Sequence, residues 1–146
     1  MDGTIMKFGG KKLESEGYDL LGLITGSEGL LGVLTEVTVK ILKKPQSVKA
    51  LLLGFQSVED SGQCVSDIIS GGIIPAGMEI MDKPLIKATD DYAKAGYPKD
   101  VEAILIVELD GTESEVNILI KRVEEIAKKN KSTYLRISKN DEERLR

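Results

Sequence analysis

The feature that most constrains the fold is the order of apolar segments after Pro45, where strand-like and helix-like patterns alternate. Four apolar runs have the length and composition of β-strands, at 47–55, 75–81, 102–110 and 132–138. Long helical patterns follow the first and third runs, and a short one at 83–92 follows the second. The order is therefore β-α-β, an extra helix, then β-α-β. It predicts an α+β, ferredoxin-like (split βαβ) fold with one antiparallel sheet and the helices on one face.

Capping signals mark where these helices begin. Thr112 and Glu115 form a capping-box pattern, and Ser57 with Asp60 predicts a similar start for the preceding long helix. Asp82 is the expected N-cap of the helix at 83–92. After residue 139 the chain shows the start of one more helix.

Each long helix has an expected inward face. In the helix after Thr112 the apolar positions are Val116, Leu119, Ile120, Val123, Ile126 and Ala127. In the helix after Ser57 they are Val58, Ser61, Val65, Ile68 and Ile69, and the helix is expected to end at Gly71 and Gly72. Cys64 lies beside the apolar face of the helix after Ser57 and is expected to be a small, partly buried packing residue.

The chain before Pro45 carries weaker patterns. Residues 3–11 predict a short strand that ends in a glycine turn. Asp19 is placed to cap a short helix. Residues 33–41 alternate β-branched side chains with others, which predicts a strand.

Composition excludes several chemistries. The chain has no histidine and one cysteine, so it offers no Ser-His-Asp site, no His-ligated metal and no internal disulfide of its own. We therefore expect no metal site, and any chemistry would rest on carboxylates, lysines, tyrosines or a cofactor, with no single residue assigned as catalytic. A single cysteine suits a reducing, cytoplasmic compartment.

Charge and hydropathy limit the partners. Twenty basic against 24 acidic residues give a net charge of −4, which argues against a nucleic-acid partner, and only six residues are aromatic for base stacking. No apolar run approaches the roughly 20 residues that a transmembrane helix needs.

The segment TGSEGLLGV, residues 25–33, is the main candidate site. Gly26, Gly29 and Gly32 are spaced by three, which differs from the dinucleotide fingerprint. Such glycines let a backbone approach a ligand closely, and Ser27 adds a hydroxyl. On spacing alone, a tight connector between helix and strand is the simpler interpretation.

Three stretches resemble FAD-linked oxidases of the vanillyl-alcohol-oxidase type, near the glycolate oxidase large subunit and D-lactate dehydrogenase. They are GYDLLGLITGSEGLLGVLTEVTVKI at 17–41, GGIIPAGMEIMDKPLI at 71–86 and AGYPKDVEAILIVELDGTESEV at 95–116. The resemblance implies FAD as the cofactor. It implies contacts to FAD from Gly26, Ser27, Glu28, Gly29, Leu30, Leu31, Gly32 and Val33.

The same resemblance divides the chain. Residues 1–44 would be the C-terminal edge of an α+β FAD-binding domain, residues 45–139 a ferredoxin-like cap, and residues 140–146 the start of a truncated helix. The chain would then be an internal fragment, inactive alone, of an enzyme that transfers hydride from a 2-hydroxy acid to flavin.

The resemblance also implies a small 2-hydroxy-acid substrate, partner subunits of an oxidase complex and a cytoplasmic location, peripheral to the inner membrane. Strand edges exposed in such a fragment would favour self-association. A stand-alone ferredoxin-like regulatory or protein-interaction module is the alternative. Glu79 lies where the family cap faces the flavin domain, although a sheet-face role is simpler.

Overall fold

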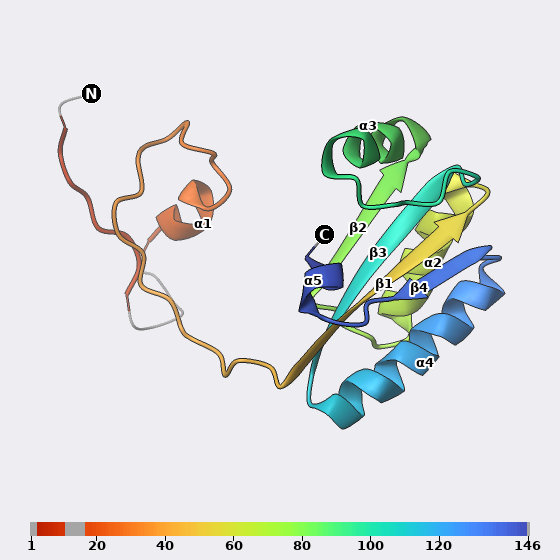
Figure 1. Ribbon diagram of the computed structural model, residues 1–146. Helices are drawn as coiled ribbons and strands as arrows, with labels where there is room; N and C mark the ends of the chain where they lie inside the picture. Colours follow the sequence, from red (N-terminus) through yellow and green to blue (C-terminus); the bar gives the residue numbers. More distant parts are fainter. Residues whose placement is uncertain (1–2, 11–16, 146) are drawn as a thin grey trace. The chain divides into compact units, whose positions relative to one another are not determined.

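The computed structural model describes residues 3–10 and 17–145, and the chain divides into two units, 1–42 and 43–146 (Figure 1). The second unit holds a four-stranded antiparallel sheet in the order β2-β3-β1-β4. Its strands are β1 (Ser47–Phe55), β2 (Gly77–Asp82), β3 (Ala103–Gly111) and β4 (Tyr134–Ile137). The central strands β1 and β3 come from the two different βαβ halves, as the split-βαβ arrangement requires, so the predicted fold class is confirmed.

Antiparallel registers align the strands over most of their length. β1 pairs with β3 from Ser47↔Gly111 to Phe55↔Ala103, and with β4 from Leu51↔Ile137 to Gly54↔Tyr134. β2 pairs with β3 from Gly77↔Glu108 to Asp82↔Ala103. Because side chains alternate between the two faces, residues 52, 106 and 136 share one face of the sheet, with residue 79 beside them.

The main core lies under α2 (Val58–Ser70) and α4 (Glu113–Lys129). Its fully buried members come from both helices and from alternate strand positions: Leu51, Leu53, Phe55, Cys64, Ile68, Leu105, Val107, Leu109 and Val123 among them. We call this side of the sheet the first face. Burial of these side chains contributes to the free energy of folding roughly 25 cal/mol for each Å² of apolar area removed from water.

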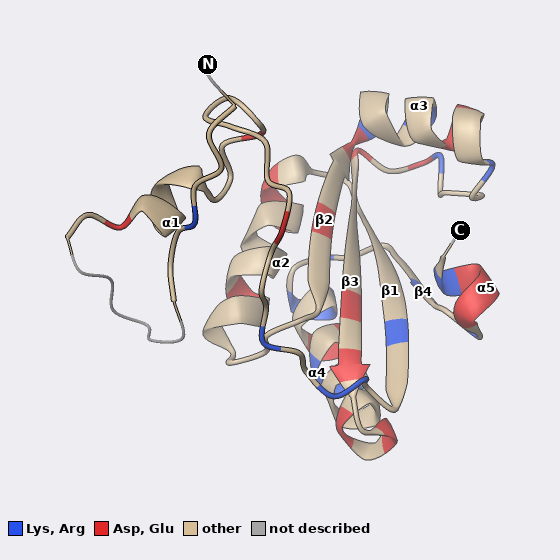
Figure 2. Ribbon diagram, turned by 90° about the vertical axis from the view of Figure 1, so that its left-hand side faces the viewer, with Lys and Arg blue, Asp and Glu red and all other residues tan. Residues whose placement is uncertain are grey.

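A smaller core lies on the opposite, second face. Leu52, Val101 and Ile104 are buried there with Ile86 of α3 (Lys83–Ala93). The short helix α5 (Asp141–Arg144) also lies on this side, opposite α2 (Figure 2). The expectation that helices cover one face therefore holds for α2 and α4, and α3 departs from it because β1 and β3 are apolar on both faces.

The predicted caps are in place. Thr112 and Glu115 form the full capping box of α4, and the side chains of Ser57 and Asp82 accept from the amides of Asp60 and Leu85. The predicted inward face of α2 is wrong in part. Ser61, Cys64 and Ile68 are buried, whereas Val58 and Ile69 are 45% and 50% exposed, so the face is centred on Cys64.

The first unit contains α1 (Leu20–Ile24), with Asp19 as its N-cap, as predicted. The strands predicted at 3–11 and 33–41 are wrong for the residues that the structure describes, since residues 3–10 and 33–42 have no regular secondary structure. Residue 11 lies outside the described residues. An alternating pattern supplies strand propensity, but a strand also needs a hydrogen-bonded neighbour.

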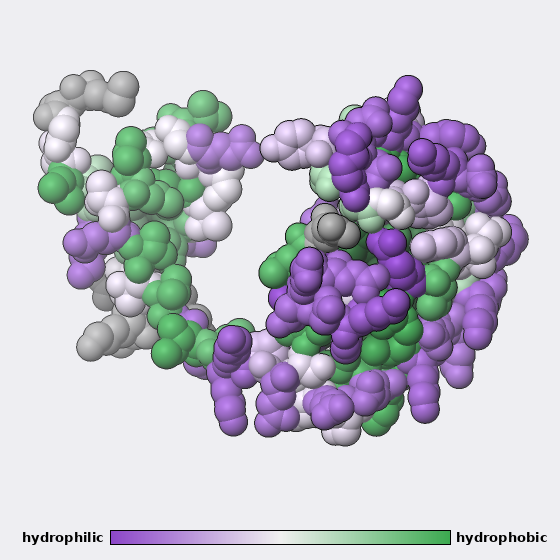
Figure 3. Space-filling view, viewed as in Figure 1, coloured by the Kyte–Doolittle hydropathy of each residue, from purple (hydrophilic) through white to green (hydrophobic). Residues whose placement is uncertain are grey.

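Apolar side chains stay in solvent along much of this unit. Val33, Ile41 and Leu42 are 87%, 86% and 86% exposed, and green apolar surface is frequent over the unit in Figure 3. No helix in the part of the chain that the structure describes is long and apolar enough to cross a membrane.

Candidate functional site

The glycine segment begins where α1 ends. Thr25 closes the helix, with its backbone amide and its Oγ1 both donating to the carbonyl of Leu21, at 3.1 and 2.7 Å. The Ser27 amide donates to the Ile24 carbonyl, and the Leu30 amide to the Ser27 carbonyl at 2.9 Å. Two consecutive tight turns therefore carry the chain from the helix into residues 31–33.

Backbone conformation explains two of the three glycines. Gly26 and Gly29 have φ of +77° and +81°, a region that glycine enters without a steric penalty. A Cβ added at Gly26, Gly29 or Gly32 would meet nothing within 4 Å. Packing within the described chain therefore does not require glycine here, and the space beside all three backbones is open.

Glu28 is the exception among the turn residues. Its φ is +51°, although it carries a side chain, and that conformation costs on the order of 1 kcal/mol. Among the described residues, the amides of Glu28 and Gly29 donate to no other group. Successive free amides in a turn form a small cradle for an anion or a carbonyl oxygen.

The eight predicted FAD-contacting residues form one continuous, mostly open segment. Leu30 and Val33 are 88% and 87% exposed, and Leu31 is 59% exposed. The segment fits a bound cofactor in its free amides and its unfilled space beside glycine.

Two other residues considered from the sequence are also placed. Asp82 is the N-cap of α3, so its carboxylate is occupied by the Leu85 amide at 3.0 Å. Glu79 is exposed on β2, paired in register with Ile106 on the second face.

Cys64 is fully buried in the main core instead of partly buried as expected. Burial raises the pKa of its thiol to about 11, with a smaller contribution from the charge of Asp67. The thiol is therefore neutral and unreactive at physiological pH. Among the described residues, no group of three or more His, Cys, Asp and Glu side chains is placed to hold a metal ion.

Sequence reasoning did not find a cavity of about 80 Å³ on the second face. Residues of three strands (β1, β3 and β4), of the segments after α3 and β4, and of α5 line it, among them Tyr97, Ile106, Arg136, Ser138, Glu143 and Arg144. These residues are distant in sequence. The only local signal was the alternation that places Leu52, Ile106 and Arg136 on one face.

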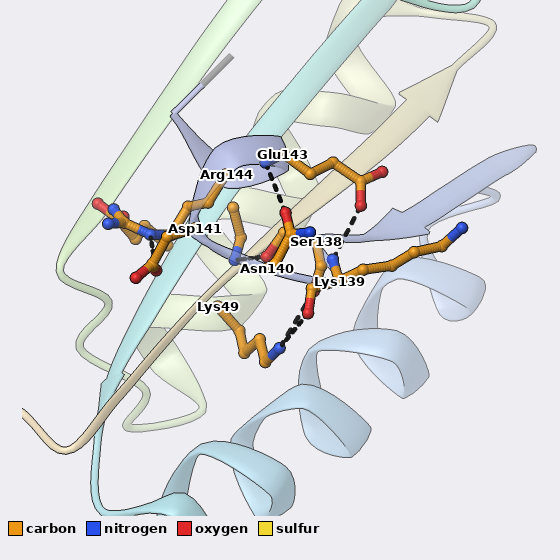
Figure 4. Close-up of polar contacts among 9 residues, drawn as sticks. Lys49, Ser138, Lys139, Asn140, Asp141, Glu143 and Arg144 are labelled. Atoms are coloured by element: carbon orange, nitrogen blue, oxygen red, sulfur yellow. Dashed lines mark hydrogen bonds and ion pairs between the residues drawn. The ribbon is translucent and has the colours of Figure 1, made fainter.

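Polar contacts hold α5 at the edge of this cavity (Figure 4). Lys49 donates to the carbonyls of Ser138 and Lys139 at 3.3 and 3.2 Å, and Glu143 accepts from the Lys139 amide at 2.9 Å. Arg144 pairs with Glu108 at 2.5 Å and with Asp141 at 3.3 Å. The Glu108 carboxylate is the main reason that the pKa of Arg144 is raised.

The chain belongs to the FAD-linked oxidases, since residues 44–146 match the family model described as "FAD linked oxidases, C-terminal domain". Named relatives agree with this class. The chain is 51% identical to the glycolate oxidase subunit GlcD of Escherichia coli K12, over all of this chain and 29% of that protein. It is 39% identical to GlcD of Bacillus subtilis, over 97% of this chain and 30% of that protein.

More distant relatives extend the comparison. A D-lactate dehydrogenase of Anaerostipes hadrus is 33% identical, over 85% of this chain and 28% of that protein. A solved structure of alkyldihydroxyacetonephosphate synthase superposes with a TM-score of 0.63 at 20% identity, over 86% of this chain and 26% of that one, which supports the fold alone. The chain thus spans about three tenths of the length of the curated relatives it matches.

Proposed function

We propose that this chain is part of an FAD-dependent oxidoreductase that oxidises a 2-hydroxy acid of the glycolate or D-lactate type. Two observations support this. Identity to a glycolate oxidase subunit extends over the whole chain, including residues 1–43, which lie outside the matched C-terminal domain. The D-lactate dehydrogenase relative is named for another 2-hydroxy acid.

The domain division is part of the proposal. Residues 1–44 form the C-terminal edge of the FAD-binding domain, residues 45–139 form the cap, and residues 140–146 begin a further helix. The family match that starts at residue 44 and the boundary between the two units after residue 42 support this division.

The observation that carries the proposed cofactor site is the open turn at residues 26–33. Its free amides at Glu28 and Gly29 are suited to donate to an acceptor on FAD, while Gly26 and Gly29 let the backbone come close. Glu28 would accept from a ribose hydroxyl. When bound, FAD supplies the acceptor for the hydride that leaves the carbinol carbon of the acid.

The protein's share of the reaction is to position substrate beside the cofactor. We assign no catalytic residue within these 146 residues. The chain alone is expected to be inactive, and the longer protein is expected to take a small 2-hydroxy acid and to associate with other oxidase subunits, as the word subunit in the relatives' names suggests. We expect a cytoplasmic location at the periphery of the inner membrane.

An absorbance spectrum after purification with added FAD tests the proposal. The full-length protein should retain a yellow flavin spectrum, and the 146-residue chain should lose it on desalting. If neither protein retained flavin, the turn would be a structural connector and a regulatory-module function would be favoured.

The turn itself is tested by Gly29→Asp in the full-length protein. A side chain at φ +81° costs about 1–2 kcal/mol, and the added carboxylate repels phosphate, so FAD affinity should fall at least about tenfold. Gly10→Asp is the matched control, since Gly10 is exposed, has open space around it and needs no positive φ. Equal flavin content in the two variants would count against the assigned turn.

A further inference from the structure

The second-face cavity has the size of a small organic acid. Its volume of about 80 Å³ is several times the roughly 10–15 Å³ that one water molecule needs in a cavity. That space is enough for a small molecule of a few non-hydrogen atoms. Ala50, Leu52, Ala95 and Ile106 supply an apolar part of its lining.

Arg136 is the cation of this cavity with the most unused hydrogen-bonding capacity. Its contacts among the described residues are a long bond from Nη1 to the Gly96 carbonyl at 3.4 Å and an ion pair from Nε to Glu143 at 4.0 Å. A guanidinium carries five N–H donors, so most of them are left for another partner. The side chain is 34% exposed, which leaves it partly shielded from solvent yet reachable.

Neighbouring charges do not occupy Arg136 fully. Arg144, the other cation of the cavity, is bonded to Glu108 and Asp141. Glu143 faces Arg136, but its other oxygen accepts from the Lys139 amide at 2.9 Å. A carboxylate ligand within about 3 Å of Arg136 would interact with it more strongly than Glu143 does at 4.0 Å.

Tyr97 adds a polar side chain to the lining, and its backbone is held in place. The Asp90 carboxylate accepts from the amides of Gly96 and Tyr97, at 2.7 and 3.2 Å, and this clamp holds the segment after α3 in place. Within the part of the chain that is described, the hydroxyl of Tyr97 has no hydrogen-bond partner. It is therefore available to a hydroxyl or carboxylate of a ligand.

We propose that this cavity binds a small monocarboxylate, with Arg136 holding the carboxylate through charge-assisted hydrogen bonds and Tyr97 contributing a hydroxyl. The choice of a 2-hydroxy acid as the occupant rests on the proposed function. A site of this kind would place one wall of the substrate pocket on the second face of the sheet. Arg136 would then set the preference for an acid over a neutral alcohol.

The test is a titration of the ¹⁵N-labelled 146-residue chain with sodium glycolate at constant ionic strength, followed by NMR. Saturable shifts are expected at the amides of Gly96, Tyr97 and Arg136 and at Nε of Arg136. Acetate, which lacks the 2-hydroxyl, should bind more weakly than glycolate. Neutral glycolamide, which lacks the carboxylate, should not bind. If acetate bound as tightly as glycolate, the cavity would be a general carboxylate site. That result would overturn the choice of a 2-hydroxy acid as the occupant.

Two variants decide whether Arg136 is the anchor. Arg136→Gln should weaken glycolate binding at least about tenfold, as expected for loss of charge-assisted bonds. Lys139→Gln removes a nearby positive charge that does not line the cavity, and it should leave binding unchanged. Equal loss in both variants, or shifts that map elsewhere in spectra of folded protein, would overturn the proposal.

Failure of this proposal is separable from failure of the flavin proposal. In the full-length protein, Arg136→Gln should leave the flavin spectrum unchanged. If the full-length protein retained no flavin while glycolate still bound to the 146-residue chain, the cofactor proposal would fail and the cavity proposal would be supported. If flavin were retained while glycolate did not bind at Arg136, the cavity proposal alone would fall.

Discussion

Ser61 has the only buried side-chain polar atom without a hydrogen-bond partner among the described residues, and it lies in the middle of α2. A buried hydroxyl that makes no bond has lost its hydration without compensation. Ser61→Ala should therefore leave the free energy of unfolding unchanged or raise it by about 1 kcal/mol. Urea unfolding of both proteins measures the difference.

Ser57→Ala is the matched control on the same helix, because Ser57 Oγ accepts from the Asp60 amide. Loss of that cap should lower the free energy of unfolding by about 1 kcal/mol. Destabilisation by Ser61→Ala as large as that of Ser57→Ala would show that the Ser61 hydroxyl has a partner after all.

Gly54 lies where two side chains of the second face leave no room for a Cβ. An added methyl would come within 2.8 Å of the Tyr134 Cβ and 2.9 Å of the Val101 Cγ1. Gly54→Ala should therefore lower the free energy of unfolding by about 1–3 kcal/mol through overpacking. Gly77→Ala, at an open strand position, should change it by no more than about 0.5 kcal/mol.

Cys64 gives the stability a dependence on alkaline pH. Its pKa is about 11 in the folded protein and near 9.0 when unfolded, so between these values the unfolded chain binds fewer protons than the folded one. The contribution of this thiol to the free energy of unfolding is fully present below pH 9 and is lost as the pH rises toward 11, by roughly 3 kcal/mol in total. Cys64→Ala should remove that alkaline loss in urea unfolding followed against pH, although the cavity lowers its overall stability.

Among the elements, those with local signals were predictable from the sequence. The capping box at Thr112 and the N-caps Ser57 and Asp82 located the starts of three helices. The apolar runs located the central strands β1 and β3. For the residues that the structure describes, the strands predicted at 3–11 and 33–41 are wrong, because an alternating pattern indicates strand propensity, while strand pairing depends on residues elsewhere.

The same distinction separates the two sites. The turn at 26–33 is continuous in sequence, so its glycines could be singled out there. The second-face cavity joins Leu52, Ile106 and Arg136, which the β-sheet registers bring together, with Tyr97 of the segment after α3. A one-residue error in register would place such side chains on the opposite face, so sequence patterns alone could not locate it.

Residues 33–41 provide a prediction at this scale. Because they lack regular structure and carry exposed β-branched side chains, their amides should exchange with solvent rapidly in the 146-residue chain. In the full-length protein we expect slow exchange, as strand pairing would satisfy these amides. Hydrogen exchange with mass spectrometry compares the two, with residues 103–109 of β3 as a protected internal reference. Fast exchange in both would count against a strand role.

For the whole molecule, residues 43–146 are expected to fold without the first unit. All four strands and both cores of the described chain belong to this range. A protein of residues 43–146 should therefore melt within a few degrees of the 146-residue chain, followed by circular dichroism. Loss of cooperative melting in the shorter protein would contradict this independence.

The pairing of β1 with β4 has a consequence for how this module can be carried by a larger protein. The Ser138 amide donates to the Ala50 carbonyl at 2.9 Å, so the chain arrives at the sheet and departs from it at neighbouring points. A module whose ends are adjacent can be inserted into a host chain without separating the host's flanking segments, and it tolerates circular permutation.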